Sequence, residues 1–236
     1  MTRPLVGVIG GLGPLATAYF VERVVECTDA SSDQDHIDQV VFSHAAIPDR
    51  TAYVLDSNAP NPGPVLAEDA QRLERFGATF LVMPCNTAHA FASYVTAAVT
   101  TPFLSIIDVT VAEVLRRSPD TTTVGFLATA GSVKAGVYAA AFESHGISLI
   151  TPDDAGQDLL HSVIYDQVKA GLPSNPDTLN SLVASLVHRG ASQVILGCTE
   201  LSVAAVDHDL LHRPEIVDAM DQLVTATILK AGGTLR

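Results

Sequence analysis

Short runs of apolar residues alternate along the chain with longer segments in which apolar and polar residues recur at helical spacing. The runs predict buried strands at 5–9, 40–42, 80–83, 103–107, 124–128, 147–150 and 194–196. The longer segments predict helices at 15–26, 65–76, 88–98, 108–117, 133–145, 155–170, 177–189 and 214–231. Alternating strands and helices form parallel sheets covered by helices on both faces, so we expect an α/β fold.

Proline, glycine and polar residues mark the breaks in this pattern. The segment 46–64 carries four prolines and Gly63 and is predicted as a loop. Residues 129–132 are predicted as a turn. Asp108 is a candidate N-cap for the helix that ends at Arg117.

The second half of the chain resembles the first. Val6-Gly7-Val8 aligns with Val124-Gly125-Phe126 at an offset of 118, and Cys85 aligns with Cys198 at an offset of 113. Two strand-loop-helix units at nearly one offset suggest an internal duplication. Any chain of alternating strands and helices also aligns with itself, so both interpretations stay open.

Each of these two cysteines follows an apolar run and precedes polar residues, Asn86 and Thr87 in one case and Thr199 and Glu200 in the other. Both thiols are therefore expected at the carboxyl ends of strands, where ligands bind in open α/β sheets.

Three interpretations of the pair remain. Cysteine is often a small buried hydrophobe. Cys85 and His89 lie four residues apart and can share a helix face as metal ligands, but the chain offers no third ligand at a suitable spacing. Two thiols can also act as an acid and a base, since a thiol pKa of about 8.5 is lowered near a helix N-terminus. Cys27 falls within the first predicted helix and is expected to be inert.

Composition narrows the class of protein. The chain is 47% hydrophobic and 17% charged, enough for a sizeable core. Its formal net charge of −13 argues against nucleic-acid and anionic membrane partners. No stretch reaches about 18 uncharged apolar residues, and no signal peptide precedes the first strand. Three cysteines do not suggest a disulfide scaffold, so we expect a cytoplasmic protein.

The glycine-rich stretch Gly11–Ala16 formally fits a dinucleotide-binding fingerprint. The acidic residue that this fingerprint needs after the second strand is missing, since Ser43-His44-Ala45 stands there. A tight strand-to-helix turn is the simplest interpretation. Its backbone amides are also suited to a substrate carboxylate at the helix N-terminus.

Two cations stand out in this acidic chain. Arg50 lies in the long predicted loop, and an arginine there can bind a carboxylate bidentately. Lys169 is one of only three lysines, and Tyr165, four residues before it, shares its helix face. By themselves, Tyr165 and Lys169 cannot be distinguished from residues of an ordinary solvent-exposed helix surface.

Taken together, five segments resemble the aspartate/glutamate racemase family, whose enzymes work without pyridoxal phosphate. The segments are GGLGPLAT (10–17), IPDRT (47–51), PCNTAH (84–89), VKAG (168–171) and LGCTEL (196–201). They span nearly the whole chain in the family's order. The family usually has Met where this chain has Leu12, a swap of similar volume.

The resemblance implies two pseudo-symmetric α/β domains with the active site in the cleft between them. We expect the first domain at 1–101 with 208–236, whose C-terminal helix returns to it, and the second at 102–207. Cys85 and Cys198 match the catalytic cysteines. The family's substrate-binding positions are matched by Asn86, Thr87, Thr129, Ser132 and Thr199, and we also expect Glu200 to bind substrate. The basic residues that bind a side-chain carboxylate are matched by Arg50 and Lys169.

The expected activity is therefore racemisation of an acidic amino acid, with aspartate favoured over glutamate. We expect no cofactor, no metal and a homodimer. Related alternatives are a hydantoin racemase or a maleate isomerase-like enzyme. A non-catalytic amino-acid-binding protein on the same fold is an alternative of a different class.

Overall fold

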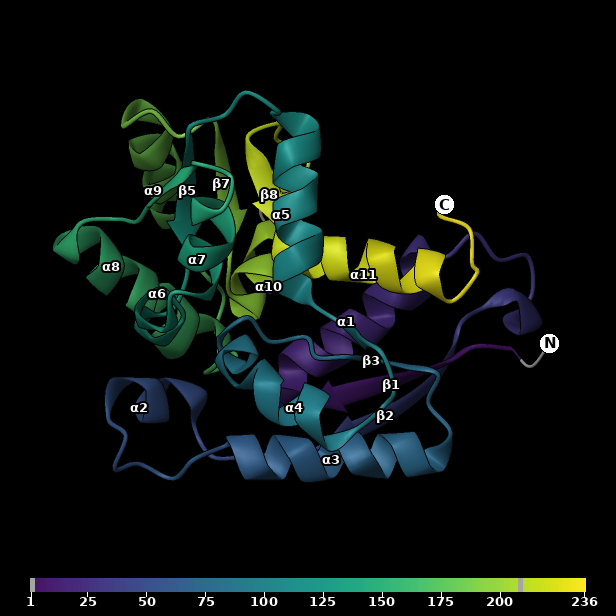
Figure 1. Cartoon of the computed structure of the whole chain (residues 1–236). Coiled ribbons are helices and arrows are strands. Elements are labelled where there is room, and N and C mark those ends of the chain that lie inside the picture. Colours follow the sequence, from purple (N-terminus) through teal and green to yellow (C-terminus); the bar gives the residue numbers. More distant parts are fainter. Residues whose placement is uncertain (1–2, 208–209) are drawn as a thin grey trace. The chain divides into compact units, whose positions relative to one another are not determined.

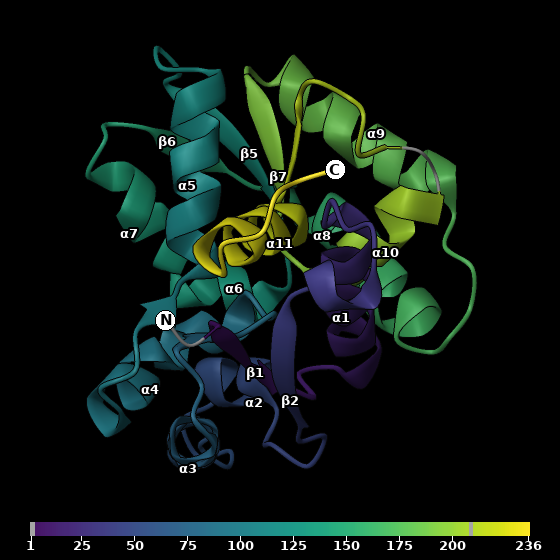
Figure 2. The same ribbon diagram turned by 90° about the vertical axis from the view of Figure 1, so that its right-hand side faces the viewer.

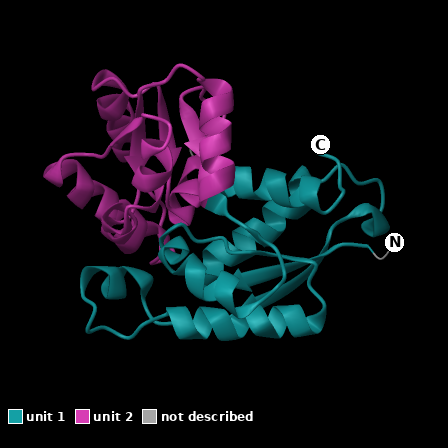
Figure 3. Ribbon diagram, viewed as in Figure 1, with its two compact units in different colours: residues 1–106, 220–236 teal, residues 107–219 magenta. Residues whose placement is uncertain are grey.

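The computed structural model describes residues 3–207 and 210–236, and it divides into two compact units. Residues 1–106 and 220–236 make up the first unit and residues 107–219 the second (Figure 3). The first division follows residue 106, whereas the sequence suggested residue 101. The second follows residue 219; the sequence suggested 207, and residue 208 lies outside the described part of the chain.

The first unit is built on a parallel four-stranded sheet of order β2-β1-β3-β4. Helix α3 covers one face of this sheet and α1 the other (Figure 1). Helix α11 lies beside α1 (Figure 2), where Arg23 of α1 and Asp221 of α11 form an ion pair of 3.3 Å. The strands are β1 (Leu5–Gly10), β2 (Asp38–Ser43), β3 (Phe80–Val82) and β4 (Phe103–Leu104); the helices are α1 (Pro14–Cys27), α2 (Arg50–Leu55), α3 (Gly63–Phe76), α4 (Ala92–Ala98) and α11 (Ala219–Lys230), with 3₁₀ turns at Asp33–Asp35 and Thr87–Phe91.

The second unit repeats this topology with the order β6-β5-β7-β8, again all parallel. Its strands are β5 (Thr123–Leu127), β6 (Ser148–Ile150), β7 (Gln193–Leu196) and β8 (Ile216–Asp218). Its helices are α5 (Ile106–Arg117), α6 (Ala130–Ala135), α7 (Val137–Glu143), α8 (Asp154–His161), the π-helix Ser162–Val168, α9 (Pro176–His188) and α10 (Thr199–Asp207). The α/β expectation is confirmed.

The registers of the two sheets match at the offsets found in the sequence. Gly7 of β1 pairs with Leu81 of β3, and Gly125 of β5 pairs with Val194 of β7. An added Cβ at Gly7 would lie 3.3 Å from the Leu73 side chain on α3, and one at Gly125 would lie 3.1 Å from Leu186 on α9. In both units the glycine lets a helix pack closely on the central strand.

Several predicted elements differ from the structure. The predicted loop 46–64 contains α2, because Asp49 caps it by accepting a hydrogen bond from the Ala52 N–H at 2.9 Å. The predicted strand 103–107 ends at Leu104, and α5 begins at Ile106. Asp108 therefore lies in the first turn of α5 and was wrongly assigned as its N-cap.

The remaining corrections concern the second unit. The predicted helix 133–145 is two helices, because Gly136 takes a left-handed conformation (φ +67°) between α6 and α7. The predicted helix 155–170 is α8 followed by the π-helix. The final helix starts at Ala219 instead of 214, since Ile216–Asp218 pairs with β7 as strand β8. Helix α10, after Cys198, was not predicted.

Candidate active site

Cys85 and Cys198 occupy equivalent places at the carboxyl edges of the two sheets. Cys85 lies four residues beyond Leu81, the partner of Gly7, and Cys198 lies four residues beyond Val194, the partner of Gly125. Both residues are 6% exposed. Two buried thiols thus stand where each parallel sheet presents its ligand-binding edge.

The Cys85 segment is anchored by His89. The Nδ1 atom of His89 lies 2.8 Å from the Cys85 carbonyl oxygen, and the Ile106 N–H donates to Nε2 at 3.2 Å. Nε2 therefore carries the lone pair, and Nδ1–H donates to the carbonyl. Burial lowers the pKa of His89 to about 4, so the ring is neutral at neutral pH.

This anchoring bears on the possible metal site. A histidine ligand uses one ring nitrogen for the metal, but both nitrogens of His89 hold backbone groups. His89 is thus a structural residue. Among the described residues, no group of three or more His, Cys, Asp or Glu side chains has the arrangement of a metal site.

The neighbours of Cys85 belong to the same turn. Asn86 precedes the 3₁₀ turn Thr87–Phe91 as its N-cap, and Thr87 is the first residue of that turn. Asn86 is 3% exposed and Thr87 is 7% exposed. Polar side chains buried at a sheet's ligand edge are suited to holding a polar ligand.

The Cys198 thiol has a carboxylate beside it. The thiol donates to Glu200 Oε2 at 2.9 Å, and the Thr199 hydroxyl reaches the same oxygen at 3.3 Å. The Glu200 side chain is 9% exposed, and its other oxygen, Oε1, lies 3.9 Å from Lys169 Nζ. Burial raises the pKa of Cys198 well above its usual range, and the adjacent Glu200 charge raises it further. At neutral pH Cys198 therefore carries its proton.

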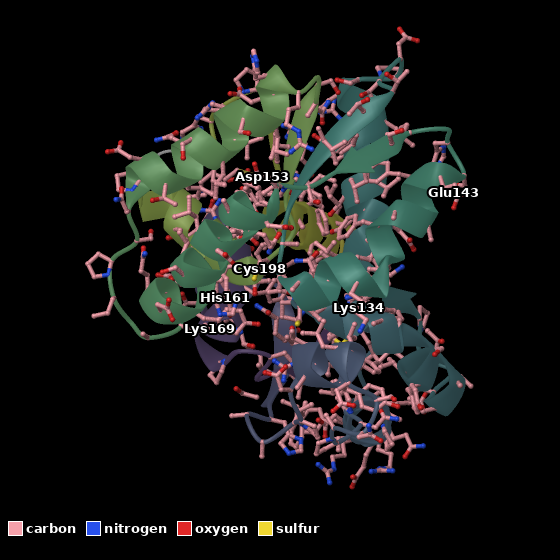
Figure 4. The ribbon with its side chains drawn as sticks, turned by 90° about the vertical axis from the view of Figure 1, so that its left-hand side faces the viewer. Lys134, Glu143, Asp153, His161, Lys169 and Cys198 are labelled. Atoms are coloured by element: carbon pink, nitrogen blue, oxygen red, sulfur yellow. The ribbon has the colours of Figure 1, made fainter. Side chains whose placement is uncertain are left out.

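Figure 4 shows Cys198, His161 and Lys169 in one region of the second unit. Lys169 follows the π-helix as its C-cap, and its backbone N–H donates to the Ile164 carbonyl at 3.0 Å. Cys198, Glu200 and Lys169 therefore lie close together in this unit. The sequence analysis had expected Cys198 to be catalytic and the other two residues to bind substrate.

Thr129 and Ser132 lie at the end of β5, next to the strand that leads to Cys198. Thr129 caps α6: its hydroxyl oxygen accepts the Ser132 N–H at 3.1 Å and lies 3.1 Å from the Ser132 hydroxyl. Both residues are buried, at 5% and 1% exposure. The N-terminal turn of α6 therefore lies at the same sheet edge as Cys198.

Arg50 belongs to the first unit, at the start of α2. Its Nη1 donates to the Ile47 and Pro48 carbonyls at 3.3 and 3.1 Å. Its Nε is buried and has no hydrogen-bond partner among the described residues. A buried donor of this kind is suited to a carboxylate ligand.

The glycine loop between β1 and α1 is filled by the protein itself. A Cβ at Gly11 (φ +87°) would lie 2.4 Å from the His44 backbone, and one at Gly10 would lie 2.5 Å from the Thr17 side chain. The Gly11 N–H donates to the Thr17 hydroxyl at 2.9 Å. These glycines permit close packing of the chain. The loop is therefore better interpreted as a tight strand-to-helix turn than as a dinucleotide-binding site.

The third cysteine, Cys27, ends α1 and is only half-buried. Burial raises its pKa. It lies within a helix and not at the carboxyl edge of a sheet, in contrast to Cys85 and Cys198.

Sequence reasoning missed the contact between Glu200 and the Cys198 thiol and assigned Glu200 to substrate binding. The close spacing of Cys198 and Glu200 was the available signal. The Glu200 carboxylate can reach the Cys198 thiol only in some side-chain conformations, and the sequence pattern does not determine which conformation is adopted.

The fold has two parallel sheets of matching strand order, and a buried cysteine beside polar residues lies at the carboxyl edge of each sheet. The model of the Asp/Glu/Hydantoin racemase family matches residues 9–227, and the chain belongs to this family. It is accordingly an isomerase of the racemase type.

Solved structures and a curated protein agree with this assignment. The structure is similar to the Picrophilus torridus aspartate racemase, with 29% identity, a TM-score of 0.81, and coverage of 99% of this chain and 96% of that one. It shares its fold with an aspartate racemase homologue from Pyrococcus horikoshii OT3, at 24% identity and a TM-score of 0.78 over 98% of this chain and all of that one. The broad specificity amino-acid racemase RacX of Bacillus subtilis (strain 168) is 23% identical over 95% of this chain and 96% of its own length.

No helix in the described ranges is long and apolar enough to cross a membrane.

Proposed function

We propose that the protein racemises an acidic amino acid without a cofactor, aspartate in preference to glutamate, with Cys85 and Cys198 as its two acid-base groups. The observation that carries this proposal is the equivalent position of the two buried thiols in two sheets of identical strand order. Inversion at Cα requires a base on one face of the carbon and an acid on the other. A duplicated thiol supplies one chemical group in both roles.

In the proposed reaction one thiolate takes the Cα proton, so the Cα–H bond breaks and its electron pair moves into the α-carboxylate as an enediolate. The opposite thiol then donates its proton to the other face of Cα. The thiol and the thiolate have exchanged roles when the product leaves. Cys198 is protonated at neutral pH because of burial and Glu200, so we assign it as the acid of the resting enzyme and Cys85 as the base.

The enediolate needs stabilisation by groups positioned before the reaction begins. We assign this role and substrate binding to the buried polar residues at the two sheet edges. In the first unit these are Asn86 and Thr87; in the second they are Thr129, Ser132 and Thr199.

The preference for a dicarboxylic substrate rests on two cations. A buried carboxylate without a partner is costly. Arg50 has a buried Nε without a partner in the described chain, and Lys169 keeps a third of its side chain exposed beside Glu200. We propose that both hold the distal carboxylate. The similarity to the Picrophilus torridus aspartate racemase supports aspartate as the substrate.

Racemisation is tested by incubating L-aspartate, D-aspartate and their glutamate counterparts with the protein in D₂O, without added cofactor. Deuterium at Cα together with formation of the opposite enantiomer is expected for aspartate first. A protein that binds aspartate but leaves its Cα proton unexchanged is a binding protein, and the proposal is then wrong. Turnover of a hydantoin or of maleate instead would assign a different activity within the family.

A further inference from the structure

The turn that follows β2 is held to helix α3 by a hydrogen bond between His44 and Asp69. His44 comes directly after the last residue of β2, at the carboxyl edge of the first sheet. Its Nδ1 atom lies 2.8 Å from Oδ2 of Asp69, which belongs to α3 on one face of that sheet (Figure 1). A carboxylate only accepts hydrogen bonds, so Nδ1–H of His44 is the donor.

The Asp69 carboxylate is a fixed point for this turn. The Asp69 side chain is 1% exposed, against 28% for that of His44. A buried carboxylate is costly without donors, and Asp69 has His44 on Oδ2 and Arg72 on Oδ1, at 3.1 Å. Asp69 and Arg72 belong to the same helix, so it is the bond to His44 that connects the buried carboxylate to the turn.

The backbone of His44 is fixed as well. Its N–H donates to the Gly10 carbonyl at 3.2 Å, and its backbone packs so closely on Gly11 that a Cβ there would lie 2.4 Å away. His44 thus joins the turn to the loop after β1 through its backbone and to α3 through its side chain.

This turn in turn positions Arg50. The His44 carbonyl accepts the Ile47 N–H at 3.4 Å and closes the turn. The carbonyls of Ile47 and Pro48 then accept hydrogen bonds from Arg50 Nη1 at 3.3 and 3.1 Å. A shift of the turn would therefore move the two acceptors that hold this part of the guanidinium.

We propose that His44 is a positioning residue: bonded to Asp69, it fixes the turn whose carbonyls place the Arg50 guanidinium for the side-chain carboxylate of an acidic substrate. The effect on specificity rests on the proposed function, in which Arg50 binds that carboxylate. The position of the turn itself is independent of any activity.

The position of the turn is tested by hydrogen–deuterium exchange of the full chain, measured in peptides that cover residues 44–52. His44→Ala should exchange about tenfold faster there, because a local opening no longer breaks the bond to Asp69. His44→Asn should exchange as the unaltered protein does, since its amide N–H lies close to the place of Nδ1–H and can donate to Asp69. Ile47 is buried among apolar residues of α3 and keeps the turn attached in both variants.

Arg72→Met is the matched control for this measurement. It removes the other donor from the same carboxylate but leaves His44 in place. Exchange at 44–52 should therefore stay unchanged, even where the melting temperature falls as far as that of His44→Ala. Unchanged exchange in His44→Ala would overturn the inference, and so would an equal increase in His44→Asn or in Arg72→Met.

The effect on specificity is tested by kinetics. His44→Ala should raise KM for aspartate about three- to tenfold, as for the loss of one hydrogen bond, with little change in kcat. His44→Asn should restore the value, and KM for alanine should not change in either variant. Equal increases in KM for aspartate and alanine, or a loss confined to kcat, would contradict a role through Arg50. If the unaltered protein racemises no amino acid, the proposed function fails, while exchange at 44–52 still decides whether His44 fixes the turn.

Discussion

The two halves of the molecule share an anchor for their cysteines but surround the thiols with different charges. In the first unit, His89 connects the Cys85 turn to the Ile106 N–H, shortly after β4. In the second, Ser202 is the equivalent residue, and its hydroxyl donates to Asp218, the last residue of β8, at 2.6 Å. The fourth residue after the cysteine thus bonds to the start of α5, just after β4, in the first unit and to the end of β8 in the second.

The residue two positions after the cysteine differs. It is the neutral Thr87 in the first unit and the acidic Glu200 in the second. Only the second thiol therefore has a carboxylate of this kind, which raises its pKa. The comparison teaches that a duplicated backbone can keep its geometry while the side chains surround each thiol with different charges.

Removal of either thiol should produce the largest effect. Cys85→Ala and Cys198→Ala should each lower racemisation by about a thousandfold, the typical contribution of a general acid or base. Any exchange of the Cα proton that remains in these variants should involve one enantiomer only, which Cα-deuterium incorporation measures separately for L- and D-aspartate. Cys27→Ala is the matched control and should keep full activity. Full activity in either of the first two variants would exclude a two-base mechanism.

The anchor of the first unit should make stability depend on pH. The folded-state pKa of His89 is about 4, against 6.5 for an ordinary histidine. Below about 6.5 the unfolded chain binds a proton that the folded chain does not, so the free energy of unfolding should fall by about 3 kcal/mol as the pH drops to about 4.

Urea unfolding of the protein from pH 7 to pH 4 measures this fall. In His89→Gln the pH dependence should be flatter, although the variant is less stable overall. His145→Gln, which changes an exposed histidine, should keep the full dependence. The same slope in both variants would show that His89 is not the group responsible.

Arg50 and Lys169 are the two cations proposed to bind the distal carboxylate. Lys169→Ala and Arg50→Ala should each weaken kcat/KM for aspartate by about 2–3 kcal/mol, as for a lost charge-assisted hydrogen bond. Activity on a neutral amino acid should hardly change. Lys134→Ala, on α6, is the control. Equal losses on aspartate and alanine would mean that these residues hold the α-carboxylate or the fold.

Substitutions at Gly7 and Gly125, the glycines of the two central strands, compare how tightly the two sheets are packed. A Cβ at Gly7 would lie 2.6 Å from Leu81 and 2.8 Å from Ala78, whereas the nearest atoms to one at Gly125 are 3.1 Å away. Gly7→Ala should therefore destabilise the protein by about 1–3 kcal/mol through overpacking, and Gly125→Ala should cost less. Thermal unfolding of the two variants measures the difference. A larger loss at Gly125 would contradict this order.

The smallest change concerns the charge next to Cys198. Glu200→Gln keeps the size of the side chain and removes its charge, so the pKa of Cys198 should fall while burial still holds it above the ordinary value. The rate of alkylation against pH, measured with Cys27 and Cys85 replaced by Ala, reports this pKa. An unchanged profile would show that burial alone sets the protonation of Cys198.

The repeated strands and the places of both cysteines could be predicted because each depends on a local pattern: an apolar run followed by polar residues. Strand β8 was missed because Ile216–Asp218 is short and directly precedes a long helix, and only its pairing with β7 distinguishes it. Helix α2 was missed among prolines, although Asp49 offered a cap signal.

The charges of the candidate site were less predictable than its location. The family motifs pointed to Lys169 and Glu200 separately. Their proximity depends on how the π-helix packs in the folded second unit, and the spacing of residues in the sequence does not predict this packing. Likewise His89 fits a metal ligand by spacing alone, and only its two backbone hydrogen bonds exclude that role.

The π-helix has a consequence for how this segment can change in length. A π-turn closes its hydrogen bonds one residue further along the chain than an α-turn does, as between the Lys169 N–H and the Ile164 carbonyl. Deleting one residue such as Asp166 from Ser162–Val168 would let these turns close as α-turns, so α8 and Lys169 would keep nearly the same relative direction. Deleting two residues would turn α8 by about 100° relative to Lys169. The segment that leads to Lys169 can therefore lose one residue in length, but not two, without changing the direction of its side chains.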